Sequence, residues 1–251
     1  MDQGANSSPQ SAVARRVAFF GGSFDPPHLG HLGVARAAQA ALGLDIVLFA
    51  PVGAQPLKPR GASADFEDRL AMTRLAIAGE PGFDLSLADA PKSSGAPNYT
   101  LETLLTLRAE LPPESAFFCL MGADAFAAFS HWHRAAEIPF VASLIVASRP
   151  GQRLDDLMAA LPKGLAVDSL PQSDQPAKEI ELRSCVLRNP AGEQAPLYLL
   201  PGLEIEISAS EIREQMLIRE QTRASAGVPP PERTLLPIPV SEYIRAHNLY
   251  R

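Results

Sequence analysis

The stretch GGSFDPPHLGHL, residues 21–32, constrains the fold of this chain more than any other. It follows a short apolar run, residues 17–20, which has the length and content of a buried strand. It precedes a run of strong helix formers, residues 33–42, that ends at Gly43, a residue suited to the end of a helix. The stretch is therefore predicted to be a strand-to-helix turn. In an open parallel sheet such a turn lies at the carboxyl edge, where ligands bind.

The residues of this turn suit a phosphate site. Gly21 and Gly22 allow the backbone to come close to a ligand. Asp25 is expected to cap the following helix, with Pro26 or Pro27 in the first helical turn. The amides and the positive dipole end of that helix would then face the turn, which favours the binding of an anion there.

His28 and His31 are three residues apart and so share one face of the helix start, with Gly30 keeping that face open to a large ligand. Two imidazoles that face a polyphosphate supply donors where charge develops during phosphoryl or nucleotidyl transfer. The pattern is neither a Walker motif nor the dinucleotide-binding fingerprint. A lone histidine at a helix start is more often solvated or capping. Two histidines, three glycines, an aspartate and two prolines within twelve residues favour the functional interpretation.

The rest of the chain alternates between apolar strand-like runs and helix-forming segments. Further strands are expected at residues 46–50, 83–87, 116–121, 141–147 and 203–207, with a hairpin at 180–187 and 197–200. Helices are expected at residues 65–78, from Tyr99 to the prolines at 112 and 113, after Asp124, at 154–161, after Ser208 and at 240–247. This alternation predicts an α/β fold, a doubly wound parallel sheet of Rossmann-like type with helices on both faces.

The domain organisation follows from composition. Residues 1–14 are rich in Ser, Gln and Ala and are expected to be a disordered tail. Residues 15–251 are expected to form a single domain, with insertions near 170–200 and 221–234 where the strand–helix rhythm is lost. We expect the segment 171–196, which is rich in Pro, Gln, Glu and Lys, to be peripheral and replaceable.

Charge and cysteine content exclude several classes of function. With 22 Lys and Arg against 28 Asp and Glu, the net charge is −6, which argues against broad binding to nucleic acid or to membrane surfaces. The longest apolar run, residues 138–147, is about half of the ~18 residues that a membrane span needs. The two cysteines, Cys119 and Cys185, make neither a disulfide framework nor a metal site, and a cytoplasmic location is expected.

Two motifs, one near each end of the chain, resemble those of a known superfamily. GGSFDPPHLGHL is similar to the signature of the nucleotidyltransferases with an HxGH motif, and ISASEIR, residues 207–213, is similar to their ISSTxxR motif. Within the superfamily the chain most resembles the bacterial nicotinate-mononucleotide adenylyltransferases, from Arg16 to Tyr250. Shorter supporting matches are Tyr99-Thr100, Gly122-Ala123-Asp124, Trp132, Arg149-Pro150-Gly151 and the segment 239–250. The sequence departs from the family at Ala209-Ser210, usually Ser-Thr, and at Leu57, often His.

The resemblance implies adenylyl transfer from ATP to nicotinate mononucleotide in NAD biosynthesis, giving deamido-NAD and pyrophosphate by direct in-line attack without a covalent enzyme intermediate. It implies that His28, His31 and Arg213 are catalytic. The implied ATP- and phosphate-binding residues are Gly21, Gly22, Ser23, Phe24, Lys58, Gly122, Asp124, Ser208 and Ser210. The implied mononucleotide-binding residues are Thr100, Trp132, His133 and Arg149. Mg²⁺ would be carried by the ATP phosphates, so that no protein metal ligands are expected.

Several of these residues have a second interpretation. Arg213 could be a solvated partner of Glu211 or Glu214 on the same helix, although the motif favours phosphate binding. Ser208 could serve only as a helix cap, and the two roles are compatible. Asp124 could equally cap its helix or bind a ribose or base.

On other residues the ordinary structural role is the starting point. Lys58 lies on a loop and is by default a solvated lysine. Trp132 could be a large core residue, but it is the sole tryptophan, lies in a polar His-Trp-His run and is expected to stack on a pyridinium ring. His131, His133 and His247 are expected to be non-catalytic.

Alternative functions remain open from the sequence. On the same scaffold the acceptor could instead be nicotinamide mononucleotide or phosphopantetheine. In a different class, the chain could be a nucleotide-binding regulator that has lost turnover, although the intact His28, Gly30, His31 and Arg213 argue against this.

Overall fold

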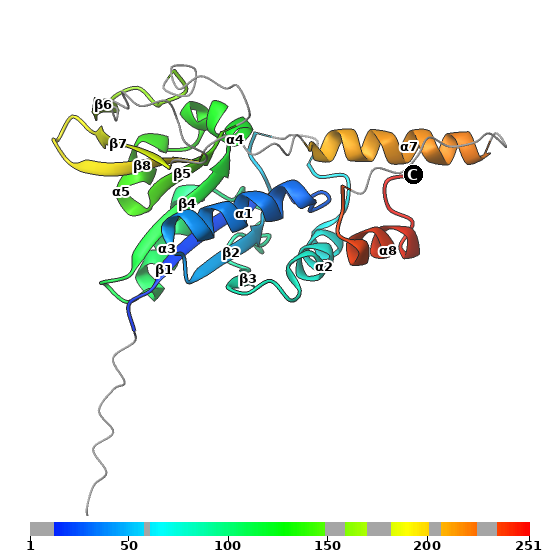
Figure 1. The fold of residues 1–251 in the computed structure, drawn as a ribbon. Coiled ribbons are helices and arrows are strands. Elements are labelled where there is room, and N and C mark those ends of the chain that lie inside the picture. Colours follow the sequence, from blue (N-terminus) through cyan, green and yellow to red (C-terminus); the bar gives the residue numbers. More distant parts are fainter. Residues whose placement is uncertain (1–12, 58–60, 149–158, 170–181, 201–206, 225–234) are drawn as a thin grey trace, which may run out of the picture.

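The structure, a computed structural model, describes residues 13–57, 61–148, 159–169, 182–200, 207–224 and 235–251 (Figure 1). In this part of the chain eight strands form one sheet in the order β3-β2-β1-β4-β5-β8-β7-β6. Their bounds are β1 Arg16–Gly22, β2 Ile46–Pro51, β3 Phe83–Leu85, β4 Ala116–Gly122, β5 Ser143–Ala147, β6 Ala166–Ser169, β7 Arg183–Arg188 and β8 Gln194–Leu200.

The sheet is parallel from β3 to β8, and β7 and β6 add an antiparallel edge. The antiparallel pairing of β7 with β8 arises because a tight turn containing Gly192, whose φ is +86°, joins these two strands into a hairpin. The predicted α/β fold is therefore confirmed. It differs from the prediction in that one edge of the parallel sheet is mixed.

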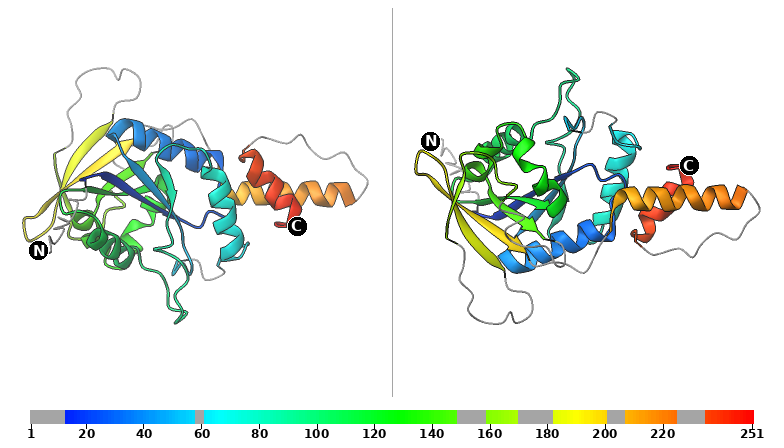
Figure 2. Two further views of the ribbon diagram at one scale, coloured as in Figure 1. Left: turned by 90° about the horizontal axis from the view of Figure 1, so that it is seen from below. Right: turned by 90° about the horizontal axis from the view of Figure 1, so that it is seen from above.

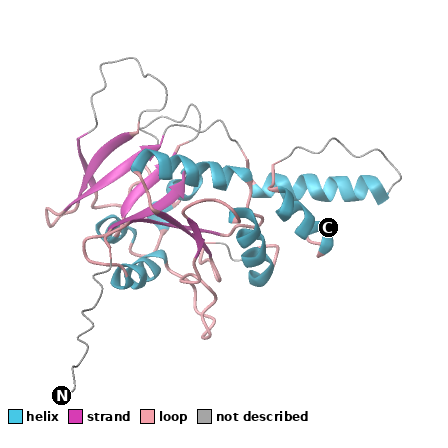
Figure 3. Cartoon of the chain, turned by 60° about the horizontal axis from the view of Figure 1, so that its bottom comes forward, coloured by secondary structure: helices cyan, strands magenta, loops and turns pink. Residues whose placement is uncertain are grey.

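Helices cover both faces of the sheet, as predicted (Figure 3). Alternate residues of β1 point to opposite faces, so that Phe20 packs with Leu32 of α1 while Phe19 packs with Leu104 of α3. The helices of the described chain are α1 Leu29–Leu42, α2 Phe66–Ile77, α3 Thr100–Glu110, α4 Ala123–Ala127, α5 Ile138–Val141, α7 Ala209–Ala224 and α8 Ile238–Ala246. None of them is long and apolar enough to cross a membrane.

A third apolar cluster joins three helices beside the sheet, at the end where β1 leads into α1. It contains Met72 of α2, Ile212 of α7, and Val240 and Ile244 of α8. In Figure 2 α8 crosses the near half of α7 close to α2, and the far half of α7 extends beyond the body of the molecule. The cluster therefore brings the C-terminal part of the chain next to the helix that follows β2.

The first strand-to-helix turn differs from the prediction in detail. Helix α1 begins at Leu29 and has His28 as its N-cap, so that Asp25 and the two prolines lie outside it. Asp25 does not cap α1 because its carboxylate accepts hydrogen bonds from the backbone N–H groups of Ser63 and Ala64, at 2.6 and 3.0 Å. The predicted end of the helix is confirmed, with Gly43 in the left-handed region at φ +57°.

The bounds of several other strands and helices differ from the predicted bounds. Strand β3 stops at Leu85, and β5 starts at Ser143 because the apolar residues before it form the short helix α5. Helix α7 continues to Ala224, so residues 221–224 are helical rather than part of a loop. The predictions for residues 154–158, 170–181, 203–206 and 225–234 lie outside the described residues.

The expectation that residues 171–196 are peripheral is wrong for the part that the structure describes. Strand β8 pairs with β5 inside the sheet, and β7 pairs with β8. Cys185 and Leu187, which lie within this segment, are each at most 3% exposed and belong to the core on one face. The hairpin is thus part of the main sheet, and its removal would expose that core.

Candidate active site

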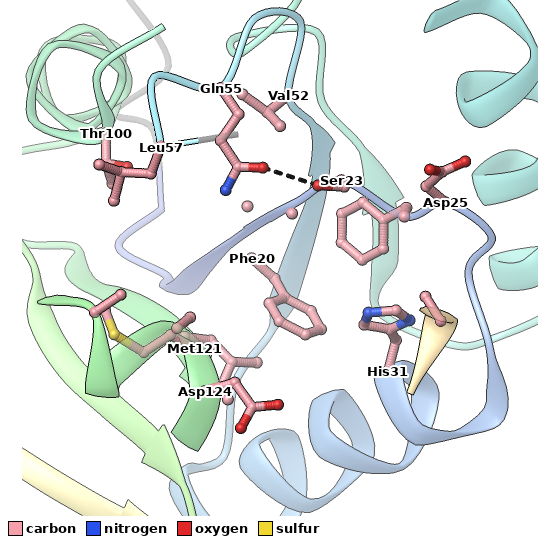
Figure 4. Close-up of a pocket in the computed structure, with 18 of the residues that line it drawn as sticks. Phe20, Ser23, Asp25, His31, Val52, Gln55, Leu57, Thr100, Met121 and Asp124 are labelled. Atoms are coloured by element: carbon pink, nitrogen blue, oxygen red, sulfur yellow. Dashed lines mark hydrogen bonds between the residues drawn. The ribbon is translucent and has the colours of Figure 1, made fainter. Parts of the chain in front are cut away.

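A cavity of about 1080 Å³ lies at the carboxyl ends of the central parallel strands. Its floor includes Gly21 and Gly22 at the end of β1, Met121 and Gly122 at the end of β4, and Ala147 at the end of β5. Figure 4 shows Ser23 and His31 on one side of this cavity and Thr100 and Asp124 on others. The turn of residues 21–32 is therefore at the carboxyl edge of the sheet, as predicted.

His28 and His31 lie together at the start of α1. Their rings are stacked with centroids 3.7 Å apart, and the backbone N–H of His28 donates to Nδ1 of His31 at 3.2 Å. His28 is only 6% exposed, and its Nδ1 has no hydrogen-bond partner in the described part of the chain. Burial lowers the pKa of His28 to about 4, which makes the ring neutral at pH 7.

Gly30 lies between the ring of His28 and the segment that leads into α7. A Cβ at this position would come within 2.9 Å of Nδ1 of His28 and 3.5 Å of Cβ of Ile207. The absent side chain therefore makes room for the ring of His28, while Ile207 lies at an ordinary contact distance from the start of α1.

Arg213 of α7 reaches back to the turn after β1. Its guanidinium donates to the backbone carbonyl of Asp25 through Nη1 and to Oγ of Ser210 through Nη2, the latter at 3.2 Å. Nη1 also lies 3.6 Å from Oδ2 of Asp25. These contacts, rather than Glu211 or Glu214, hold Arg213 beside the cavity. Ser208 directly precedes α7, and its carbonyl accepts from the N–H of Ile212.

The segment between the two glycines and His28 is held in an unusual conformation. Phe24 is a non-glycine residue in the left-handed region, with φ +47°, and its ring is buried 4.9 Å from that of His31. Next to it, the hydroxyl of Ser23 donates to Oε1 of Gln55 at 2.9 Å (Figure 4). The carbonyl of Ser23 accepts from Nη1 of Arg69 at 2.7 Å.

The opposite end of the cavity is aromatic. Trp132 is partly buried and meets the edge of Phe129 at 5.6 Å between centroids, while the rings of Tyr99 and His133 lie 4.4 Å apart. Thr100 opens α3 beside them. Trp132 therefore packs partly on the core and also lines the cavity.

Asp124 lies in the first turn of α4 and also lines the cavity. The N-cap of that helix is Gly122, so the capping position that the sequence left open for Asp124 is occupied by another residue.

Two loops near the aromatic end are held by buried polar groups. The side chain of Asn98 accepts from the N–H of Ala54 and donates to the carbonyl of Ala90. Asp89 is 4% exposed and accepts from Oγ1 of Thr103 at 2.7 Å, and its burial raises the pKa of its carboxyl group. These bonds fix the start of α3, and with it Thr100, relative to the loop after β2.

All but two of the predicted site residues line this one cavity. Those that do are Gly21, Gly22, Ser23, Phe24, His28, His31, Thr100, Gly122, Asp124, Trp132, His133, Ser208, Ser210 and Arg213. Lys58 and Arg149 lie outside the described residues. In the described part of the chain, no group of three or more His, Cys, Asp or Glu side chains is placed to hold a metal ion.

Sequence reasoning missed Gln55 and Arg69. The sequence carried a signal for Arg69, because it shares the buried stripe of α2 with Met72, Thr73 and Ala76, and a charge on such a stripe needs a partner. Leu70 and Leu75 of the same helix are only partly buried. Gln55 carries no comparable signal, since it lies in a loop.

The comparisons with known proteins agree with this geometry. Residues 19–215 match the cytidylyltransferase-like family. The chain is 35% identical over 240 residues to a probable nicotinate-nucleotide adenylyltransferase of Gloeobacter violaceus, covering 95% of this chain and 97% of that one. It is also 35% identical to a protein of the same description from Xylella fastidiosa, covering 92% and 95%. The chain belongs to the nicotinate-nucleotide adenylyltransferases. Members of this family are nucleotidyltransferases, enzymes that use ATP to adenylylate a nucleotide.

A solved structure shares the fold. The nicotinic acid mononucleotide adenylyltransferase of Plasmodium falciparum, determined in complex with NaAD, superposes with a TM-score of 0.63 at 17% identity, covering 94% of this chain and 97% of that one. At this identity the likeness concerns the fold alone. It places this nicotinate-nucleotide adenylyltransferase family member on the same mixed, mostly parallel α/β framework.

Proposed function

We propose that this chain transfers the adenylyl group of ATP to nicotinate mononucleotide, giving deamido-NAD and pyrophosphate. The observation that carries the proposal is the meeting of His28 and His31 with Arg213 and Ser210 at one end of a cavity whose other end is aromatic. Membership of the nicotinate-nucleotide adenylyltransferases supports the same assignment. The product places the reaction in the synthesis of NAD.

The reaction needs no nucleophile from the protein. An oxygen of the 5′-phosphate of the mononucleotide attacks the α-phosphorus of ATP in line and forms the new P–O bond. The bond from the α-phosphorus to the bridging oxygen breaks, and pyrophosphate leaves with the electron pair. Catalysis then consists of positioning the two substrates and stabilising the charge that develops between them.

The polar end of the cavity would hold the triphosphate. His28 and His31 would donate to oxygens near the reacting phosphorus, and Arg213 would neutralise charge on the leaving pyrophosphate. The remaining contacts would come from the side chains or backbone of Gly21, Gly22, Ser23, Phe24, Lys58, Gly122, Asp124, Ser208 and Ser210. Mg²⁺ would enter as part of the substrate, carried by the phosphate oxygens.

The aromatic end would receive the mononucleotide. Trp132 would stack on the cationic pyridinium ring through a cation–π contact, which the acid and the amide forms share. Choice of the acid would come from donors around its carboxylate, namely backbone amides near Thr100 and His133 and the guanidinium of Arg149. In a site built from donors alone, the NH₂ group of the amide would face other N–H groups and find no acceptor.

Side-by-side kinetics test this assignment. With ATP held constant, pyrophosphate release should favour nicotinate mononucleotide over nicotinamide mononucleotide by at least ~10²-fold in kcat/KM. Equal efficiencies would contradict the choice of acid, and activity with phosphopantetheine alone would move the assignment to another acceptor. Binding of ATP without release of pyrophosphate in the presence of any of these acceptors would make the chain a regulator. We place the enzyme in the cytoplasm, where the two free, buried cysteines Cys119 and Cys185 would remain reduced.

A further inference from the structure

The turn that would hold the triphosphate is fixed by Arg69 and Tyr250, which do not line the cavity, and by Asp25, which does. Phe24 has a left-handed backbone, which costs a non-glycine residue about 1–3 kcal/mol and persists only where the surroundings hold it. On one side of Phe24 the carbonyl of Ser23 accepts from Arg69. On the other side the carboxylate of Asp25, 4% exposed, accepts from two backbone N–H groups at the start of α2, those of Ser63 and Ala64.

The remaining donor to this carboxylate comes from the far end of the sequence. The hydroxyl of Tyr250, which follows α8, donates to Oδ1 of Asp25 at 2.7 Å across 225 positions. Tyr250 itself has a left-handed backbone at φ +60°, and so does Asn248 at φ +56°. Two non-glycine residues in this region within one short segment indicate that the fold holds the segment in place against a local preference. Burial, together with the charge of Asp25, raises the pKa of Tyr250, so the hydroxyl remains a donor at physiological pH.

Asp25 is therefore contacted by both Tyr250 and Arg213. Arg213 donates to the carbonyl of Asp25, and its Nη1 lies 3.6 Å from Oδ2, too far for a hydrogen bond. The carboxylate is satisfied mainly by the two amides and the tyrosine. If the hydroxyl were lost, the nearest cation available to compensate would be Arg213, which would be drawn from the cavity towards the carboxylate.

We propose that Tyr250 is a positioning residue for the ATP-phosphate site. Its hydroxyl donates a hydrogen bond to the carboxylate of Asp25 and so leaves the guanidinium of Arg213 available to the triphosphate. This inference rests on the proposed function of the site. It assigns a role in substrate binding to a residue that does not line the cavity. The expected signature is a loss of affinity for ATP, while the aromatic end of the cavity is unaffected.

The test compares two tyrosines of the same C-terminal segment. Tyr250→Phe removes the bond to Asp25, whereas Tyr243→Phe removes a similar bond, at 2.9 Å, from the Tyr243 hydroxyl to Asp68 of α2. Tyr250→Phe should raise the KM for ATP by about 5- to 10-fold, the order of one lost hydrogen bond to a charged group, while the KM for the mononucleotide stays within about 2-fold. Tyr243→Phe should leave both KM values within about 2-fold.

Binding measurements separate this mechanism from a general loosening of the site. ATP alone, without acceptor, is titrated by calorimetry into the wild type, Tyr250→Phe, Arg213→Ala and the double variant. The Tyr250→Phe change should weaken ATP binding about 5- to 10-fold in the wild type and by less than about 2-fold when Arg213 is already absent. An equal effect in both backgrounds, or an ATP affinity unchanged by Tyr250→Phe, would overturn the proposal.

All measurements are made at a temperature where thermal unfolding shows every variant to be folded. If Tyr250→Phe is unfolded wherever Tyr243→Phe is folded, the hydroxyl acts through global stability and the proposal is wrong. The binding cycle needs no turnover, so it decides the role of Tyr250 even if the wild type releases no pyrophosphate from ATP when nicotinate mononucleotide is the acceptor. In that case the proposed function fails separately.

Discussion

The rings of His28 and His31 are stacked at the first turn of α1, with an angle of 25° between the ring planes and 3.7 Å between the centroids. Two imidazolium rings at this separation would repel each other, because they would place two like charges in a partly desolvated site. Burial resolves the conflict by keeping His28 neutral. The pair can therefore take up a proton when anionic phosphates bind beside it. The first two predictions follow from this property.

The stability of the chain should fall on mild acidification because of His28. Its pKa is about 4 in the folded state against 6.5 in the unfolded state, so below pH 6.5 the unfolded chain binds a proton that the folded chain does not. The contribution of His28 to the free energy of unfolding is fully present above pH 6.5. It decreases by about 3 kcal/mol in total as the pH falls from 6.5 to 4. Urea unfolding between pH 7.5 and 4.5 should show a shallower decline for His28→Asn. Parallel curves for the two proteins would contradict this.

Binding of ATP should take up a proton at mildly acidic pH. The negative charge of the phosphates would raise the pKa of His28 from its depressed value, so that the ring becomes protonated in the complex. Calorimetry at pH 5.5 in buffers of different ionisation enthalpy measures this uptake. We expect it to disappear in His28→Asn, and the same uptake in both proteins would show that another group is responsible.

His31→Ala should lower kcat by roughly 10²-fold, the typical effect of losing one preorganised donor to the transition state. The ring also accepts from the backbone of His28, so a loss of about 1 kcal/mol in stability is expected from the weakened helix start. His247→Ala is the matched control, because that ring stacks on Tyr243 away from the cavity. A folded His31→Ala enzyme that turns over like His247→Ala would remove His31 from the chemistry.

Trp132→Ala should weaken the binding of both mononucleotides by a similar factor, about 10-fold, because the cation–π contact depends on the ring charge that the acid and the amide share. The preference for the acid should remain. Steady-state kinetics with each mononucleotide at saturating ATP measures both values. A change in the ratio larger than the change in either KM would mean that Trp132 contributes to the choice between the two substrates.

The β7–β8 hairpin should be essential for folding rather than replaceable. Leu197 on β8 is 0% exposed, and Leu197→Ala should reduce the free energy of unfolding by about 2–5 kcal/mol. Gln194→Ala, at the exposed start of the same strand, should change it by less than about 0.5 kcal/mol. Chemical denaturation compares the two. Similar stabilities would mean that this edge of the sheet is not held as tightly as its burial indicates.

Local sequence signals predicted most of the framework. The apolar run before Gly21, the helix formers after Leu32 and the left-handed Gly43 each specify their own conformation, and all three were confirmed. The position of the site could be anticipated because a strand-to-helix turn in a parallel sheet lies at the carboxyl edge, where ligands bind.

Features set by distant contacts could not be predicted in this way. Asp25 has the residue type and position of a helix cap, but its carboxylate bonds to Ser63 and Ala64, which only the packing of α2 brings near. The hairpin of β7 and β8 was visible as alternating residues, but its place next to β5 depends on pairing across about 50 residues of sequence, which no local pattern encodes.

The link from Asp25 to Arg213 spans 188 positions, and the link to Tyr250 spans 225. A polypeptide emerging from the ribosome can therefore build β1, β2 and α1 long before the groups that complete the phosphate turn have been synthesised. Closing so long a loop costs conformational entropy that only the finished core offsets, which makes this turn one of the last parts to become ordered. Nucleotide would then be captured only by chains that have been extended at least as far as Tyr250, and shorter nascent chains would not withdraw ATP from the cell.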